Sequence, residues 1–208
     1  MGAGTYSGRV VIRRPLALER DYRARLWRRL RVAATLRREG VGRAPEALVA
    51  AYEAALPLEL ASFERLAVGV EGLVTREVVR VVSALTRTDV RTDQRLTRQA
   101  ALLAQVRRQW AQVNVTRVRA LERRVLRGEL PDGRAWASVI ARDEMGSLAA
   151  HITRLRCEAL GVPRYRWVAN EGARGEHAAL HGTVRAWADE GEHPGQGRGC
   201  RCCAQPIL

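Results

Sequence analysis

Lysine is absent from this chain of 208 residues, and every one of its 36 basic residues is arginine. The 22 acidic residues leave a net charge of +14. Two explanations of the missing lysine stay open. One is a GC-rich coding bias, and the other is that the forked guanidinium group of arginine binds phosphate better than the ammonium group of lysine does. In either case a pI near 11.2 indicates a polyanionic partner, and nucleic acid is the first candidate.

Long hydrophobic runs are also missing. No stretch approaches the roughly 20 apolar residues that a membrane-spanning helix needs. The first residues lack the apolar core of a signal peptide, and Tyr6 stands where a myristoylation pattern has Ser or Thr. A composition that is 47% apolar is nevertheless enough for a core. We therefore expect a soluble protein, made in a cytoplasm and without a membrane partner.

The motifs of common enzyme classes are scarce. The sequence has no Gly-rich phosphate loop, no Ser elbow and no second pairing of an acid with a histidine at a defined spacing. We expect no enzymatic activity. One alternative stays open, a metal-dependent nuclease centred on His177, for which Glu144 and Glu176 would be the available carboxylates.

Hydrophobic spacing of three and four residues predicts a series of helices. Thr92 or Asp93 is a suitable N-cap for the fourth of them, and valines near residue 80 leave a strand alternative in the third. Short strands are expected at 165–168 and 183–187, with one more within the arm that ends at Pro15. The expected helices span 16–39, 45–57, 58–88, about 93–127 and 134–160.

The composition changes near residue 130. Residues 1–130 read as a basic helical region, and residues 131–208 as a compact module. The last part of this module, residues 164–208, holds three of the four His and three of the four Cys. The predicted fold class is α+β and mostly α. Long Arg-rich helices come first, and a small helix-plus-β module with a His/Cys-containing loop follows.

Positive charge is concentrated near the N-terminus, where residues 9–43 hold 12 Arg and three acids. This cluster could bind DNA phosphates, bind an acidic protein surface or be a solvated face. DNA contact would be independent of base sequence, because no recognition motif is present. Trp27, Trp110 and Trp136 are expected in the core. The candidate DNA-binding residues are Arg20, Arg23, Arg28, Arg31 and Arg38.

Histidines and cysteines in the last 32 residues predict a structural zinc site formed by His177, His193, Cys200 and Cys202. The Cys-x-Cys spacing is tighter than the common Cys-x₂-Cys, and His181 is an alternative to His193. Two other interpretations stay open, a disulfide and a hydrogen-bonded cluster without metal. Cys157 is expected to be a small core residue.

The same region carries an ordered pattern. An aromatic strand at Arg166-Trp167 is followed by Arg174-Gly175-Glu176-His177, by Leu180-His181-Gly182 and by Trp187. His193-Pro194-Gly195 and Cys200-Arg201-Cys202 close it, and a helix with Ile140-Ala141-Arg142-Asp143-Glu144 precedes it. This order over about residues 110–208 resembles the phage Mu F-like minor head proteins, or phage head morphogenesis family. Two departures are the segment Asn170–Ala173, where that family often has an acid, and the extra Cys203.

The resemblance implies a minor head protein of a tailed phage, located in the virion near the portal vertex. It implies help in head morphogenesis and in DNA packaging or ejection, with portal proteins, capsid proteins and packaged double-stranded DNA as partners. Assembly would take place in the host cytoplasm. A free-standing DNA-compacting protein is a weaker alternative. DNA compaction needs only positive charge, so it would not explain the Cys-Arg-Cys module. Structural roles within the motif are expected for Arg174, Gly182, Pro194, Gly195 and Arg201, with positive φ at the two glycines.

Overall fold

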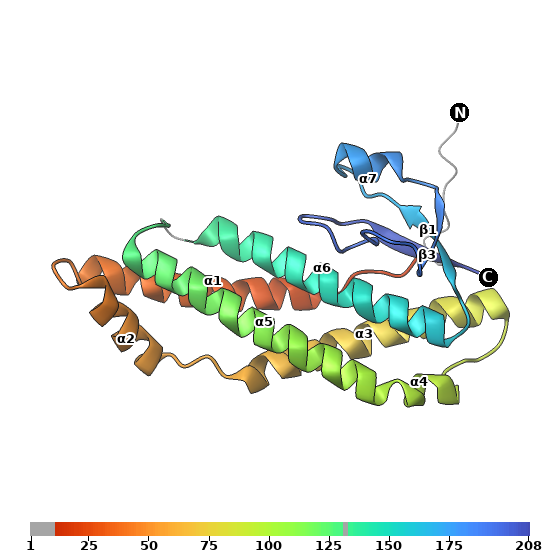
Figure 1. Cartoon of the computed structure of the whole chain (residues 1–208), viewed down its shortest axis with the longest axis horizontal. Helices are drawn as coiled ribbons and strands as arrows, with labels where there is room; N and C mark the ends of the chain where they lie inside the picture. Colours follow the sequence, from red (N-terminus) through yellow and green to blue (C-terminus); the bar gives the residue numbers. More distant parts are fainter. Residues whose placement is uncertain (1–10, 131–132) are drawn as a thin grey trace. The chain divides into compact units, whose positions relative to one another are not determined.

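The computed structural model describes residues 11–130 and 133–208 (Figure 1). In these residues the backbone forms helices and one small antiparallel sheet, so the predicted α+β, mostly α class is confirmed. The helices are α1 (Leu16–Glu39), α2 (Pro45–Ala55), α3 (Leu60–Thr86), α4 (Gln94–Arg98), α5 (Ala100–Arg127), α6 (Arg134–Ala159) and α7 (Gly175–Ala179). The strands are β1 (Arg164–Val168), β2 (Val184–Ala186) and β3 (Cys203–Ile207).

The prediction of one helix between residues 93 and 127 is wrong, because the helix is interrupted at Gln99. Asp93 caps α4 as expected, and its carboxylate accepts the Arg95 backbone N–H at 2.9 Å. At Gln99 the side chain instead makes tertiary contacts, donating from Nε2 to the Leu155 carbonyl at 2.7 Å. Arg156 also donates to the Leu96 carbonyl at 2.6 Å. These bonds hold the turn between α4 and α5, and hydrophobic spacing alone carries no sign of them.

Two elements of the C-terminal region were not predicted, the short helix α7 and the strand β3. Pro206 within β3 reads as a loop signal in the sequence. The strand tolerates this proline because β3 pairs with β1 alone in the order β2-β1-β3. The strand alternative near residue 80 is wrong, since α3 is helical throughout.

The strand expected before Pro15 falls partly outside the described residues. Val11–Pro15 is irregular backbone, and the Ile12 N–H donates to the Ala204 carbonyl at 3.2 Å. No helix in the described ranges is long and apolar enough to cross a membrane.

Contacts divide the described chain into two compact units, each discontinuous in sequence. The sheet unit comprises residues 11–15, Val70–Ala104 and Met145–Leu208, and the helical unit comprises Leu16–Gly69 and Gln105–Glu144. The boundary near residue 130 therefore stays a prediction, because the grouping by contacts follows different limits.

An aromatic cluster marks the core of the helical unit. Tyr22 lies 6.1 Å from both Phe63 and Trp110, measured between ring centroids. Trp110 is buried, as predicted for the core. The core prediction is wrong for Trp27 and Trp136, which are only half-buried. Guanidinium groups of Arg134 and Arg124 lie over their rings at 5.8 and 6.0 Å.

The sheet unit is organised around β1, the central strand. Alternate residues of β1, Tyr165 and Trp167, are fully buried. Tyr165 packs against Trp187 with ring centroids 4.2 Å apart. The other buried ring, Trp167, lies edge-to-face with His177 at 5.2 Å. β1 therefore pairs with both other strands and supplies the buried aromatic rings next to which the His/Cys residues lie.

Candidate functional site

Three of the four predicted metal ligands meet in the sheet unit. One potential ligand atom each from His177, Cys200 and Cys202 lies within 4.8 Å of the other two. His177 Nδ1 is 3.7 Å from Cys202 Sγ. All three side chains are buried, with exposed fractions of 5% or less. Three buried N and S groups this close together are of the types that a thiolate-binding cation uses as ligands.

Strand register explains how distant segments reach one place. β1 pairs with β3 so that Val168 lies opposite Cys203, which leaves Cys202 beside the end of β1. Gly182 donates from its backbone N–H to the Trp167 carbonyl at 2.8 Å. The segment between these points contains α7, and α7 carries His177. The sheet therefore brings His177 and Cys202 together from opposite sides of the same strand end.

His177 also has partners on its other ring nitrogen. Nε2 lies 3.2 Å from Glu192 Oε2 and 3.1 Å from a terminal nitrogen of Arg174. Arg174 is itself 3.5 Å from the same Glu192 oxygen. When Nε2 carries the proton, it donates to Glu192, and Nδ1 presents a lone pair toward the thiols. In the other tautomer Nε2 accepts from the Arg174 guanidinium.

The two thiols shift each other's pKa in opposite directions. A hydrogen bond from Cys202 lowers the pKa of Cys200 well below its ordinary value, with further help from the Gly195 N–H. The Gly195 nitrogen lies 3.3 Å from Cys200 Sγ. The same coupling, followed by burial, raises the pKa of Cys202. Cys200 is thus the more acidic thiol of the pair, and a bound cation would displace the protons of both.

A small cavity of about 50 Å³ adjoins the three side chains. Its lining comes from the loop after β1 and from the Cys-Arg-Cys run. This volume exceeds the ~10–15 Å³ that one water molecule needs. The lining residues are Asn170, Glu171, Gly172, Ala173, Arg174, His177, Gly199, Cys200, Arg201 and Cys202.

The fourth predicted ligand, His193, is not part of this group. Its Nδ1 lies 2.9 Å from the Tyr165 hydroxyl, and its Nε2 lies 3.4 Å from a terminal nitrogen of Arg154. The predicted substitute, His181, is exposed and accepts the Ala169 backbone N–H at 3.1 Å. Two cysteines also lie outside it: Cys157 is fully buried in α6, as expected, and Cys203 is half-exposed.

The motif residues fix the loops around the site. Gly182 and Gly195 both have positive φ, at 82° and 95°, as expected. At Gly195 a Cβ would also lie 3.2 Å from the Gly146 carbonyl oxygen, so backbone meets backbone there. Pro194 is buried beside it. Of the two arginines, Arg174 joins the Glu192 cluster, whereas Arg201 is exposed and forms no ion pair with residues in the described ranges.

Two residues beside the site were not among the predicted site residues: Glu192, and Trp167, which the sequence placed only in the aromatic strand of the motif. Glu192 directly precedes His193 in the sequence, but this adjacency does not indicate a contact with His177. Trp167 is fully buried, and its indole N–H has no hydrogen-bond acceptor in the described part of the chain. It lies near Cys202 and is one of the groups that favour the thiolate form there.

The helical unit carries the second predicted feature, a basic face on α1. All five candidate arginines are exposed, and their positions fall on one side of a helix with 3.6 residues per turn. Arg28 and Arg38 bond only to an oxygen of their own helix. Across residues 11–130 and 133–208, none of the five is paired with a carboxylate. We call Arg20, Arg23, Arg28, Arg31 and Arg38 the α1 arginine face.

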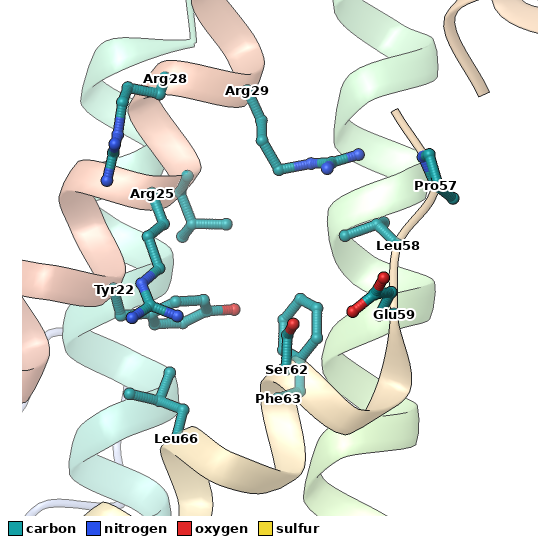
Figure 2. A pocket seen from close by; sticks show the side chains of 11 residues that line it. Tyr22, Arg25, Arg28, Arg29, Pro57, Leu58, Glu59, Ser62, Phe63 and Leu66 are labelled. Atoms are coloured by element: carbon teal, nitrogen blue, oxygen red, sulfur yellow. The ribbon is translucent and has the colours of Figure 1, made fainter. Parts of the chain in front are cut away.

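A pocket of about 390 Å³ opens in the same unit (Figure 2). Apolar side chains of α1 and α3 line it, and Figure 2 shows Arg29 extending from α1 toward Pro57 and Leu58. Arg29 is not available to a ligand, because it binds Glu122 at 2.5 Å and the Leu56 carbonyl at 2.7 Å. Glu59 is the single carboxylate in the lining, which includes no His or Cys.

Comparison with known proteins gives a family for the C-terminal part. Residues 116–205 match the family described as Phage Mu protein F like protein. An uncharacterised protein of Haemophilus influenzae (strain Rd) is 36% identical over 77 residues. That alignment covers 35% of this chain and 17% of the relative. No solved structure matches the chain.

Proposed function

Because residues 116–205 are a phage Mu F-like region, which supports a phage head-associated protein, we propose that this chain is a minor head protein of a tailed phage. It takes a structural rather than a catalytic part in the virion. It lies near the portal vertex, where it contacts portal and capsid proteins and assists head morphogenesis and DNA packaging or ejection. The family match is the observation that carries this proposal.

The α1 arginine face supplies the contact with packaged DNA. Its five guanidinium groups are exposed and have no carboxylate partner in the described residues, so their charge is available to phosphates. Guanidinium groups on an exposed helix face bind phosphates without reading base edges. The face lies outside the matched residues 116–205, so charge alone supports this part of the proposal.

Mass spectrometry of purified particles tests the main proposal. Particles of the phage or prophage that encodes this chain are isolated, and copies of the chain are counted relative to the portal protein. A few copies per particle are expected. Expression in infected cells with absence from particles would overturn the assignment to the virion.

DNA contact has a separate test. The full chain is titrated with duplexes of unrelated sequence at several salt concentrations. We expect equal affinities for the duplexes and a steep loss with salt, with a slope of about 0.9 per phosphate neutralised. Binding that is absent or independent of salt would refute DNA contact. Incubation with plasmid and divalent cations checks the nuclease alternative: cleavage that His177→Ala abolishes would replace the structural role by a catalytic one.

A further inference from the structure

We propose that His177 Nδ1, Cys200 Sγ and Cys202 Sγ bind one Zn²⁺ ion, with the fourth coordination position open to the adjoining cavity. This ligand set differs from the four residues that the sequence suggested, since His193 is replaced by a position that a water molecule can occupy. The proposal does not depend on the role of the chain in a virion.

Distances within the group agree with tetrahedral coordination. Zinc bonds of about 2.3 Å to sulfur and 2.0–2.1 Å to nitrogen place neighbouring ligand atoms roughly 3.5–3.8 Å apart. His177 Nδ1 and Cys202 Sγ are already 3.7 Å apart, and the three atoms all lie within 4.8 Å of one another. Small side-chain movements therefore suffice to close the set around an ion.

The chemistry of the donors favours zinc over the hard cations. Two thiolates and one imidazole are soft or borderline ligands, whereas Mg²⁺ and Ca²⁺ prefer oxygen. Two thiolates also neutralise the charge of one Zn²⁺, which lowers the cost of burying the ion. Cys157 is too deeply enclosed in α6 to join, and it lies outside the group.

Neighbouring polar groups lie within hydrogen-bonding distance of the proposed ligands and would hold them in place. Glu192 Oε2 lies 3.2 Å from His177 Nε2, so in the tautomer whose Nδ1 binds the ion a carboxylate is in place to accept the Nε2 proton. This carboxylate–histidine pairing fixes the tautomer and orientation of metal-binding histidines. The Gly195 N–H points to Cys200 Sγ at 3.3 Å. The buried indole N–H of Trp167, without an acceptor among the described residues, is suited to a thiolate at Cys202.

The cavity supplies the fourth position. Its volume of about 50 Å³ adjoins His177, Cys200 and Cys202 and leaves space for one water molecule beside the ion. His193 cannot take this position, because both of its ring nitrogens already have partners in Tyr165 and Arg154. The ion would thus link α7, the loop before Cys200 and the start of β3 at a single point.

Elemental analysis of the full chain tests the proposal. Protein purified without chelator from zinc-supplemented cultures is expected to hold about one zinc per chain. Cys200→Ser and Cys202→Ser are expected to lose the ion. Cys203→Ser is the matched control, because its thiol belongs to the same Cys-Arg-Cys-Cys run but lies outside the group. His193→Gln is expected to keep zinc, and loss in this variant with full retention in Cys202→Ser would overturn the ligand set.

A second measurement uses the unaltered sequence, so that misfolding of a variant cannot decide the outcome. Zinc is removed and Co²⁺ is added to the wild-type chain, with circular dichroism as the check of folding. Thiolate-to-cobalt absorption and the intense visible bands of a tetrahedral site are expected at one equivalent. A folded chain without these bands, or with a Cys200–Cys202 disulfide under reducing purification, would refute the site. Glu192→Gln is expected to weaken zinc binding by about 10–100-fold at unchanged stoichiometry.

Discussion

His177 Nδ1 lies 3.7 Å from Cys202 Sγ, although 25 positions separate the two residues in the sequence. β1 makes this approach possible, because Val168 at its end pairs with Cys203 while the Trp167 carbonyl accepts the Gly182 N–H. The site is therefore a product of sheet pairing. Its geometry depends on β3, which is joined to β1 along five residue pairs.

Removal of metal is expected to destabilise the wild-type chain. An ion at 100 times its dissociation constant contributes about 2.7 kcal/mol to the folded state. For a chain of this size the corresponding fall in the melting temperature is roughly 5–10 °C. Differential scanning calorimetry with and without a chelator measures it. Cys202→Ser should not respond to the chelator, and an equal response of both proteins would point to an effect elsewhere.

His193 is expected to make the stability depend on pH. Burial first, and then Arg154 and Arg185, lower the pKa of His193 below 6.5, against the opposite effect of Asp189 and Glu158. The folded state therefore favours the neutral ring that contacts the Tyr165 hydroxyl. This stabilisation is present above the unfolded pKa of 6.5 and is lost as the pH falls toward the lower folded pKa.

Denaturant unfolding at several pH values between about 7 and 5 measures the effect. His193→Gln should flatten the decline in unfolding free energy toward acid, with both proteins at the same zinc occupancy. Parallel pH profiles for the variant and the wild type would show that His193 does not carry the dependence.

Gly195→Ala is expected to destabilise the sheet unit by about 2–3 kcal/mol. The φ of 95° disfavours any side chain, and a new Cβ would lie 3.2 Å from the Gly146 carbonyl oxygen and 3.3 Å from the Ala150 Cβ. Gly172 is the matched control, with a φ of 73° and no atom within 4 Å of an added Cβ. Gly172→Ala should cost only about 1 kcal/mol by the same unfolding measurement. Equal losses would show that the backbone contact adds nothing to the strain.

Glu122→Gln is expected to lower the unfolding free energy of the helical unit by about 2–3 kcal/mol. Glu122 is 2% exposed and accepts hydrogen bonds from Arg29 at 2.5 Å and from the Tyr52 hydroxyl at 3.0 Å. Loss of its charge leaves the Arg29 guanidinium without a counter-ion. The control is Glu53→Gln, which removes the more exposed pair with Arg123. Its effect should be much smaller, because water and salt screen that pair.

Replacement of the α1 arginine face by five glutamines is expected to reduce the salt dependence of DNA binding. The slope should fall by up to about 4–5 if each guanidinium neutralises one phosphate. The control variant removes the same charge at arginines that already have carboxylate partners. These positions are Arg80, Arg91, Arg95, Arg123 and Arg124. Equal losses in both variants would attribute binding to net charge rather than to this face.

Local patterns were sufficient for most of the helices. Pro45 begins α2, and the Asp93 side chain caps α4, as the sequence predicted. The interruption at Gln99 was not predictable, because it depends on a hydrogen bond to Leu155, 56 residues away. Residue order indicates where a helix can begin, but a tertiary contact decided where this one breaks.

The candidate site was predictable in part for a similar reason. Residue type and clustering brought His177, Cys200 and Cys202 into one hypothesis. They could not exclude His193, because its neighbour Tyr165 is fixed by sheet register and not by distance along the chain. Nor could they indicate Glu192 as the partner of His177, since one of many exposed acids becomes relevant only when the loop is folded.

The backbones at Gly146 and Gly195 approach so closely that a Cβ added to Gly146 would lie 2.8 Å from the Gly195 carbonyl oxygen. A side chain can absorb a small displacement by changing its rotamer, whereas a backbone contact has no such freedom. A displacement of the loop that holds Pro194 and Cys200 is therefore expected to move α6 as well. In the proposed virion, a partner that binds this loop would thereby shift the position of that helix.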